Sequence, residues 1–429
     1  MKDSVVILGQ GIIGLCSAWY AVQRGFEVTV IDRHARPQQG CSFGNAGMIV
    51  PSHFVPLAAP GMVALGLKWM WNPQSPFYIK PRLDRDLIGW ALRFWQAATP
   101  ERVKRSSLVL RDLNLASRTC YEDIAALPGM EFGLQKKGLL MLCRTARGLA
   151  GEAHSAERAQ ALGVPADVLD AAGAAAVDPG AEMSIAGAIY YPKDCHLSPE
   201  RFMAALTADC GARGVKFLSG PEVTGWHREG RVLRAVRTSA GEVAGTQFVL
   251  AGGAWSAGSI QSLGLKLPLQ AGKGYSLTLE NPRELPRVCS ILTEARVAVT
   301  PMSGCLRVGG TMEMAGLNHS ITRSRVQGIL QALPAYYPAF SPADFAGIEP
   351  WAGLRPCPPD GMPYLGRTGA AENLIIATGH SMMGLSLGPV SGQIVARLLD
   401  GEPTGHPMEL LSPDRYAARK IRRHSPASI

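Results

Sequence analysis

Short apolar runs and amphipathic stretches alternate along the chain, and the first three form a strand–helix–strand pattern. Residues 4–8 are a short apolar run, typical of a parallel strand buried on both faces. Residues 12–24 carry apolar side chains at helical spacing, and Gly25 ends the predicted helix. Residues 27–31 are a second, β-branched run that closes on Asp32. The pattern predicts a βαβ unit with two parallel strands.

Further helices and short strands follow. Serine at the N-cap, proline at the first helical position and an acid in the first turn begin a helix at Ser198, which we expect to run to Gly214. Other helices are expected at 84–98, 106–127 and 321–333, in the alanine-rich surface segment 146–177, and around Val390, Ile394 and Leu398. Strands are expected at 215–218, 222–227, 231–238, 243–250 and 373–378, with antiparallel strands in 267–350.

This order of elements predicts an α/β fold with two domains. A Rossmann-like nucleotide-binding domain is joined to a discontinuous α+β substrate domain with a mainly antiparallel sheet. We expect the nucleotide-binding domain to comprise 1–56, 190–266 and 350–429, and the substrate-binding domain to comprise 57–189 and 267–349.

Composition places the chain among globular proteins. It has 429 residues, of which 47% are hydrophobic and 18% charged, and no apolar run reaches the 18 residues of a membrane span. Nine cysteines without a C-x-x-C pair predict reduced thiols, a cytoplasmic protein and no metal site. No motif indicates nucleic-acid binding.

The net charge of +9 is partly concentrated near the C-terminus. Arg415, Arg419, Lys420, Arg422 and Arg423 form a basic cluster there. A solvated tail is one interpretation. The other is peripheral contact with anionic lipid on the inner face of the cell membrane, because basic clusters are attracted to acidic headgroups.

The turn between the first strand and helix carries the first chemical signal. Gly9-Gln10-Gly11-Ile12-Ile13-Gly14 is a G-x-G-x-x-G motif, in which the glycines allow a tight turn, a close approach of pyrophosphate and close helix packing. The pyrophosphate would meet the helix N-terminus at Ile12 and Ile13. Asp32, 18 residues after Gly14, is placed to bind ribose hydroxyls. The motif predicts a dinucleotide site; the alternative is a glycine-rich turn in an ordinary βαβ unit.

The segment after Asp32 helps to choose the dinucleotide. Arg33 begins a long loop of small residues instead of a second crossover helix. A long loop directly after a nucleotide-binding strand usually encloses a ligand. This favours FAD over NAD, with six residues of this segment as candidate contacts: Arg33, Ser42, Asn45, Ala46, Gly47 and Met48.

Residues 56–130 are helical in character and rich in tryptophan. One expected apolar stripe comprises Met62, Leu65, Trp69 and Met70, and a second group comprises Trp90, Phe94 and Trp95. Core packing is one explanation. A partly exposed apolar arm that contacts a membrane or an electron acceptor is the other.

Six segments in chain order carry a resemblance to a known family. They are 9–14, 42–47, 273–277, 307–310, 353–367 and 378–380. Together they resemble the FAD-dependent D-amino acid dehydrogenases of bacteria, within the D-amino acid oxidase and glycine oxidase superfamily. Residues 48–54 and 382–389 are more similar to the D-hydroxyproline dehydrogenase branch than to the D-alanine type.

The resemblance implies roles for three substrate-site residues. Arg355 would clamp the substrate carboxylate, because a guanidinium offers parallel N–H donors and keeps its charge; the alternative is a structural arginine near a Pro-Asp-Gly turn. Tyr275 would hold the same carboxylate or line the pocket, against ordinary strand packing. His53 would lie in a loop over the flavin and contact substrate, or be a satisfied loop histidine.

The resemblance also implies contacts to the cofactor near the C-terminus. Backbone N–H groups around Gly379 and His380 would face the flavin N1–C2=O edge and stabilise the negative charge of the reduced flavin; a purely structural His380 is the alternative. The other implied contacts are the backbone of Val223 to adenine, and Gly252, Met383 and Gly384 to the cofactor. Cys357 does not match the offset of the cysteine that links flavin in sarcosine oxidases, so we expect non-covalent FAD.

The activity implied is oxidation of a D-amino acid to the imino acid by hydride transfer to flavin N5, with electrons passed to a quinone or another acceptor. D-Proline or cis-4-hydroxy-D-proline is the expected type of substrate. No side-chain base is required, which agrees with a sequence that has no evident acid/base dyad. The alternatives are a glycine- or sarcosine-type oxidase that uses oxygen, a non-catalytic FAD electron-transfer subunit, and an NAD-dependent dehydrogenase.

Overall fold

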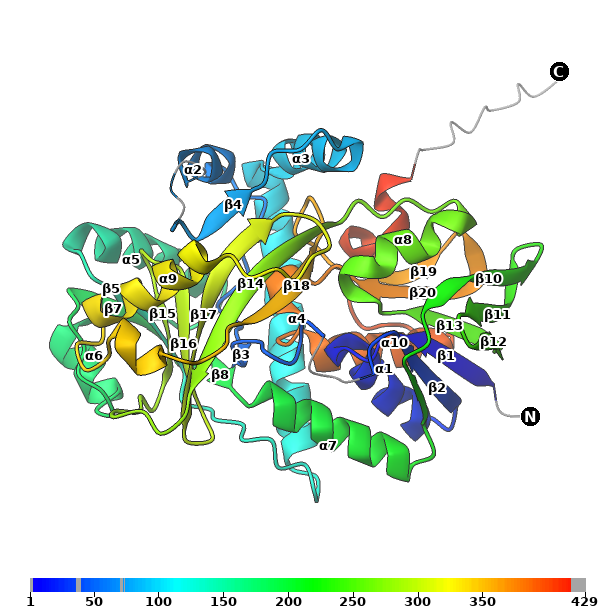
Figure 1. Ribbon diagram of the computed structural model, residues 1–429, viewed down its shortest axis with the longest axis horizontal. Coiled ribbons are helices and arrows are strands. Elements are labelled where there is room, and N and C mark those ends of the chain that lie inside the picture. Colours follow the sequence, from blue (N-terminus) through cyan, green and yellow to red (C-terminus); the bar gives the residue numbers. More distant parts are fainter. Residues whose placement is uncertain (1–2, 36–39, 70–71, 73, 418–429) are drawn as a thin grey trace.

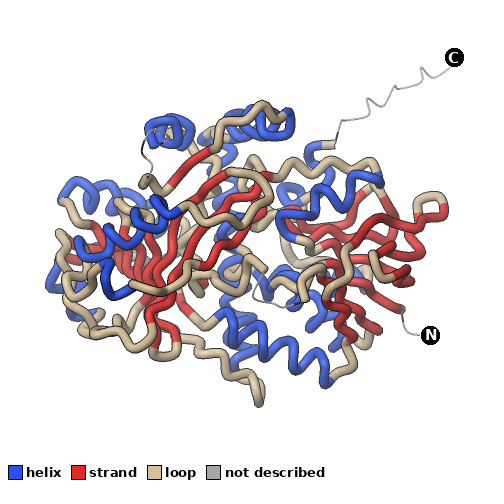
Figure 2. Tube along the Cα trace, in the orientation of Figure 1, coloured by secondary structure: helices blue, strands red, loops and turns tan. Residues whose placement is uncertain are grey.

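Two sheets form the centre of the protein, and helices separate and cover them. The computed structural model describes residues 3–35, 40–69, 72 and 74–417. Figure 1 shows a six-stranded sheet on one side and a larger sheet on the other, with the long helix α4 between them. Figure 2 shows the strands gathered in these two groups.

The six-stranded sheet confirms the Rossmann-like part of the prediction. Its order is β19–β20–β13–β1–β2–β9, and all pairs are parallel except β19–β20. The strands are β1 (Ser4–Leu8), β2 (Glu27–Asp32), β9 (Lys216–Ser219), β13 (Gln247–Leu250), β19 (Tyr364–Thr368) and β20 (Ala371–Thr378).

Different elements cover the two faces of this sheet. On one face lie α1 (Ile12–Gln23), α7 (Pro199–Ala212) and α10 (Gly388–Leu399), packed against alternate residues of β1 and β2. The intervening residues face a small sheet of β10 (Val223–Glu229), β11 (Val232–Thr238) and β12 (Gly241–Ala244), together with α8 (Ser256–Ile260). The Ser198 hydroxyl caps α7 as predicted, by accepting from Arg201 N–H.

The large sheet has the order β18–β14–β17–β16–β15–β5–β7–β6, with β4 beside β17. It is mainly antiparallel, although β15–β5 and β17–β4 are parallel. Its strands are β4 (Phe77–Ile79), β5 (Leu139–Cys143), β6 (Asp167–Asp170), β7 (Gly187–Tyr191), β14 (Gln270–Leu279), β15 (Cys289–Leu292), β16 (Val297–Met302), β17 (Cys305–Met314) and β18 (Trp351–Cys357). Met48–Ile49 (β3) and Cys195–His196 (β8) form a separate pair.

Several predicted elements differ from the structure. The segment 146–177 is not wholly helical, because β6 lies between α5 (Ala146–Ala161) and α6 (Ala171–Val177) and pairs with β7. The segment 243–250 is divided between β12 and β13. Helix α4 (Pro100–Ala125) begins earlier than expected, because Thr99 caps it and Pro100 suits the first helical position. Helix α9 (Arg323–Ala332) lies within the predicted range 321–333.

The tryptophan-rich segment serves partly as core and partly as surface. It forms α2 (Met62–Trp69) and α3 (Arg85–Ala97). Trp90 is buried, donates to the Cys357 carbonyl (2.8 Å) and stacks on Phe94. Trp95 is 65% exposed. Met70 lies outside the described residues, and no described helix is long and apolar enough to cross a membrane.

The connection from the large sheet back to β19 is held by a buried ion pair. The Asp360 carboxylate accepts from Arg415 Nε (2.9 Å) and Arg102 Nη2 (2.8 Å). Arg415 is therefore an internal ion-pair partner and not part of a solvated tail; residues 418–429, with the other basic residues, lie outside the described chain. The predicted domain boundaries stay a prediction, and β18, within 350–429, pairs in the large sheet.

Replacement of Asp360 by asparagine should lower the free energy of unfolding by about 3–5 kcal/mol at neutral pH, because Arg415 would stay buried without a counter-charge. Burial alone raises the pKa of the Asp360 carboxyl, but Arg415 and Arg102 outweigh it and hold that pKa below its ordinary value. The wild-type advantage should therefore be present above about pH 4 and disappear as the pH falls through the folded-state pKa.

Urea denaturation across this pH range measures the difference. Glu157→Gln is the matched control, because that carboxylate is exposed and its pair with His154 is a surface pair. Equal destabilisation by the two variants, or a difference that persists at low pH, would contradict the assignment.

Candidate active site

Two adjoining cavities lie where the two sheets face each other. An elongated cavity runs past the carboxyl ends of β1, β2, β13 and β20 and the first turn of α1, the usual ligand position in open parallel sheets. A second cavity of about 380 Å³ lies against β14, β16, β17 and β18. Both are lined by Cys41, Asn45, Arg355, Ser381 and Met382, so the cavities meet at these residues.

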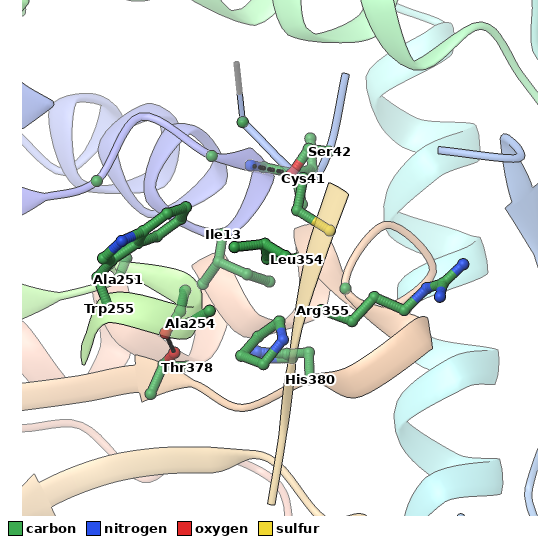
Figure 3. Close-up of a pocket in the computed structure, with 18 of the residues that line it drawn as sticks. Ile13, Cys41, Ser42, Ala251, Ala254, Trp255, Leu354, Arg355, Thr378 and His380 are labelled. Carbon is green, nitrogen blue, oxygen red and sulfur yellow. Dashed lines mark hydrogen bonds between the residues drawn. The ribbon is translucent and has the colours of Figure 1, made fainter. Parts of the chain in front are cut away.

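Figure 3 shows how the side chains surround the elongated cavity. Ile13 and Ser42 lie on one side, and His380 lies across from them. Trp255 lies at one end, and Arg355 lies at the other with its guanidinium pointing away from Trp255. The cavity thus connects the nucleotide-type turn with the cationic side chain proposed from the sequence.

The glycines of the G-x-G-x-x-G turn have the geometry that the motif predicts. Gly9 has φ +112°, and a Cβ there would lie 2.4 Å from the Ala251 carbonyl oxygen. A Cβ on Gly14 would lie 1.8 Å from the Gly9 oxygen, so only glycine permits this packing of α1. Gly11 lines the cavity and has only the Ser42 hydroxyl within 4 Å of a built Cβ. Bare backbone therefore faces the cavity at the N-terminus of α1.

Asp32 is oriented by the backbone around it. Its Oδ2 accepts from Gln10 N–H (2.7 Å) and its Oδ1 from His34 N–H (2.8 Å). The carboxylate also lines the elongated cavity, where its further lone pairs suit sugar hydroxyls.

Trp255 was not identified from the sequence, although it borders the same end of the cavity. The Arg33 guanidinium lies 5.3 Å from the Trp255 ring centroid and pairs with Glu222 (3.0 Å). Trp255 also stacks on His319, with centroids 5.9 Å apart. A tryptophan after a strand has no distinctive local signal, and only the fold brings it beside Asp32.

The loop from residue 40 to residue 48 joins the two cavities. The Ser42 hydroxyl accepts from Ile12 N–H (3.0 Å), and Asn45 Oδ1 accepts from Gly47 N–H (2.9 Å). Ala46 and Met48 line the second cavity. The loop residues predicted from the sequence are therefore brought to the junction, apart from Gly47, which lines neither cavity and packs against the Leu197 carbonyl.

Arg307 holds this loop against the large sheet. Its Nη1 donates to the carbonyls of Asn45 (3.0 Å) and Phe43 (3.4 Å), and its guanidinium pairs with Glu200. In addition, the Ser276 hydroxyl donates to the Gly44 carbonyl (2.8 Å). The motif containing Arg307 was visible in the sequence, but its partners were not.

The turn after β20 closes the elongated cavity from the other side. Gly252, His380 and Gly384 line that cavity, and Met383 lines the second one. His380 Nε2 pairs with the Ser391 hydroxyl (2.9 Å), whereas its buried Nδ1 has no hydrogen-bond partner among the described residues. Burial lowers the pKa of His380 to about 3, so its ring is neutral at physiological pH.

Besides Gly47, three predicted cofactor residues stand back from the cavities. Gly14 and Gly379 line neither; Gly379 has φ +79° and packs against Pro358 and Tyr364, so it shapes the turn. Val223 begins β10 and packs in the apolar layer between the six-stranded sheet and the small sheet of β10, β11 and β12. Val223 lines neither cavity, and the predicted contact of its backbone with adenine stays a prediction.

Arg355 projects into the second cavity from β18. Its Nη1 donates to the Thr311 carbonyl (2.7 Å). Within the described part of the chain, no carboxylate forms an ion pair with this guanidinium. Its charge is therefore available to an anion that enters the cavity.

Tyr275 and His53 line the same cavity. The Tyr275 hydroxyl donates to Glu313 (2.7 Å) and accepts from Thr322 N–H (3.2 Å), which favours a pocket-lining role over direct carboxylate binding. His53 Nδ1 pairs with the Ser52 hydroxyl (3.0 Å). Burial, with a smaller effect from Arg296, lowers the pKa of His53 to about 4 and keeps it neutral.

The second cavity has a positive electrostatic bias. Arg296 and Arg355 line it, and no aspartate or glutamate is among its described lining residues. Arg296 lies in the turn between β15 and β16 with φ +56° and was not identified from the sequence, where a turn arginine carries no signal. The cavity therefore suits a small anionic molecule.

These features fit a dinucleotide in the elongated cavity. Bare glycine backbone at a helix N-terminus suits pyrophosphate, Asp32 suits ribose, and the turn at His380 lines the opposite side of the same cavity. No group of three or more metal-ligating side chains occurs among the described residues. A dinucleotide in the elongated cavity would lie beside a second cavity that suits an anion.

Curated relatives cover nearly the whole chain. A D-amino acid dehydrogenase of Rhizorhabdus wittichii is 34% identical over 420 residues, covering 96% of this chain and 100% of the relative. A D-amino acid dehydrogenase of Vibrio vulnificus is 32% identical over 419 residues, covering 94% of this chain and 98% of the relative.

Solved structures share the fold. Glycine oxidase from Geobacillus kaustophilus has a TM-score of 0.75 at 23% identity, covering 97% of this chain and 100% of that one. L-Proline dehydrogenase from P. horikoshii has a TM-score of 0.72 at 19% identity, covering 97% and 98%. The family described as FAD dependent oxidoreductase (DAO) matches residues 4–398. With this match and the glycine-lined cavity, the chain belongs to the FAD-dependent oxidoreductase family, and its cofactor is FAD.

Proposed function

We propose that the protein oxidises a small D-amino acid to the imino acid and passes the electrons to a quinone or another acceptor. The relatives from Rhizorhabdus wittichii and Vibrio vulnificus, both D-amino acid dehydrogenases, support the reaction class. The observation that carries the proposal is the guanidinium of Arg355, which enters the cavity beside the cofactor without a carboxylate partner in the described chain. An amino-acid carboxylate supplies the missing charge.

The chain's own residues would hold cofactor and substrate in a fixed relation. Gly11 and the first turn of α1 would bind pyrophosphate, Asp32 the ribose, and the turn at His380 the flavin edge. When bound, FAD supplies the acceptor for the hydride removed from the substrate. Cys357 is buried outside both cavities, and burial raises the pKa of its thiol to about 12, which supports non-covalent FAD.

Positioning is the chain's main contribution to the rate. His53 and His380 are the histidines nearest the junction, and both are neutral because burial lowers their pKa values to about 4 and about 3. No carboxylate lines the second cavity among the described residues. A substrate whose carboxylate is fixed on Arg355 can present its Cα–H to the cofactor without a side-chain base.

The finer substrate proposal is a cyclic D-amino acid such as D-proline or cis-4-hydroxy-D-proline. Apolar side chains of the second cavity support a compact aliphatic ring: Met48, Val50, Met141, Ile291 and Met312. The alternative is a glycine- or sarcosine-type oxidase that reduces oxygen. A non-catalytic FAD subunit is disfavoured, because it would not need an arginine without a carboxylate partner in the second cavity.

We further propose that α3 places the protein on an anionic lipid surface, where a quinone is available. Ile88, Leu92 and Trp95 are spaced i, i+4 and i+7 and are 51%, 57% and 65% exposed, so they form one apolar stripe. Residues 62–97 contain five basic and two acidic side chains. Figure 1 shows α2 and α3 at the outer edge of the molecule beyond β4. An apolar stripe within a basic surface suits anionic lipid.

Anaerobic bleaching of the flavin absorbance should distinguish the candidate functions. The proposal expects fast bleaching by D-proline or cis-4-hydroxy-D-proline, slower bleaching by D-alanine, and none by the L-isomers. Rapid peroxide formation in air with glycine or sarcosine would support the oxidase instead. A flavin-loaded protein that no amino acid bleaches would contradict catalysis on amino acids.

Substitution of Arg355 by alanine should cost roughly 2–5 kcal/mol of transition-state stabilisation, as when one partner of a buried charge pair is lost. The measurement is kcat/KM with the best bleaching amino acid and an artificial electron acceptor. Arg147→Ala, at an exposed position of α5, is the control. FAD content should stay normal in both variants, and a near-normal kcat/KM for the Arg355 variant would refute the carboxylate clamp.

Sedimentation with phosphatidylglycerol vesicles tests the lipid contact. The wild-type protein should pellet with the vesicles, and Leu92→Glu combined with Trp95→Glu should leave it in the supernatant. The control is Val168→Glu combined with Leu218→Glu, which adds the same two negative charges at apolar positions that are 53% and 38% exposed. Equal sedimentation of the stripe variant and the control would rule out α3 as the lipid-binding element.

A further inference from the structure

The Arg355 guanidinium packs directly against the backbone of Gly274. Strands β14 and β18 pair with Gly272 opposite Arg355, and Gly274 follows two residues later on the same face of β14. A Cβ built on Gly274 would lie 2.2 Å from both terminal nitrogens of Arg355. Any side chain at position 274 would therefore occupy the place of the guanidinium.

A β-bulge provides the second contact. Lys273 pairs with Glu313 and Tyr275 pairs with Gly310, so residues 311–312 of β17 both stand opposite Gly274. Thr311 has φ +70°, an unusual and strained conformation for a β-branched residue. The bulge turns the Thr311 carbonyl out of the ladder, where it accepts from Arg355 Nη1 at 2.7 Å.

A buried polar network holds the bulge in register. The Tyr275 hydroxyl donates across it to Glu313, and Lys273 Nζ lies 3.7 Å from the same carboxylate. Arg325 Nε lies 3.9 Å from Glu313 on the other side. On the outer edge, Met312 N–H donates to the Pro76 carbonyl (2.7 Å). With these contacts the bulge cannot shift along β14 without leaving buried charges unpaired.

We propose that Gly274 is a positioning residue for the substrate carboxylate, acting through Arg355 together with the Thr311 carbonyl. The inference rests on the proposed function, because it assumes that Arg355 binds the carboxylate. A carbonyl orients the guanidinium through one of its five N–H donors and leaves its charge unneutralised. A carboxylate in the same place would orient Arg355 equally well but would compete with the substrate. The bulge and the glycine thus fix a cation and keep it available.

The test is Gly274→Ala, with Gly225→Ala in β10 as the matched control, because a Cβ at Gly225 has nothing within 4 Å. The three atoms nearest to the new methyl group all belong to the Arg355 guanidinium, at the end of a flexible side chain, so we expect the guanidinium to move and the strand to stay. The kcat/KM for the amino acid should fall roughly a hundredfold, as for a misplaced substrate-binding group. The loss should lie mainly in KM, with FAD content and thermal stability equal to those of the control.

Two further measurements separate this inference from the proposed function. Propanoate, titrated against the flavin spectrum, should bind wild-type protein and the Gly225 control equally and the Gly274 variant far more weakly. A crystal structure of Gly274→Ala should show Arg355 displaced from the Thr311 carbonyl. Both measurements are decisive even if no amino acid bleaches the wild-type flavin. Wild-type propanoate affinity or an unmoved guanidinium in the variant would overturn the inference.

A double variant covers the case in which Gly274→Ala fails to fold. If the clash is with Arg355 alone, Gly274→Ala combined with Arg355→Ala should fold as well as Arg355→Ala. If both single and double Gly274 variants unfold, the glycine serves the strand and the inference is wrong. In folded proteins, Gly274→Ala should have no further effect on KM once Arg355 is alanine, since coupled residues are non-additive.

Discussion

The Arg355 guanidinium, which has no carboxylate partner among the described residues, is the constraint around which the site is built. Three arginines elsewhere in the described chain have carboxylate partners: Arg307 pairs with Glu200, Arg325 with Glu313 and Arg415 with Asp360. Arg355 has only a carbonyl, and both nearby histidines are neutral. Because Arg355 is half-buried and lines both cavities, an anion that enters there gains a charged partner.

The loop of residues 40–48 joins the six-stranded sheet to the large sheet. The loop that follows the nucleotide-binding strand is held to the large sheet by Arg307 and by the Ser276 hydroxyl. Gly44 of that loop approaches the Trp351 ring so closely that a Cβ would lie 2.2 Å from it. The two cavities therefore share a wall, and their relative geometry depends on the large sheet as much as on the nucleotide turn.

Local signals were sufficient for much of the fold and for the cofactor turn. The strand, glycine turn, helix and second strand at 4–32 are specified by side-chain periodicity and by backbone conformations that only glycine adopts readily. The cap at Ser198 was equally clear. The start of α4 and strand β6 were missed, because one depends on a cap at Thr99 and the other on pairing with a distant strand.

By itself, the sequence determined the dinucleotide turn, the class of cofactor and the presence of a candidate cation at position 355. Only the tertiary structure decided that Tyr275 turns its hydroxyl to Glu313, that Arg296 joins the cavity, and that Val223 stands apart from it. The physical reason is range. Turns and caps depend on neighbours within a few residues, whereas the free charge of Arg355 depends on which strands lie beside β18 and on what they leave unpaired.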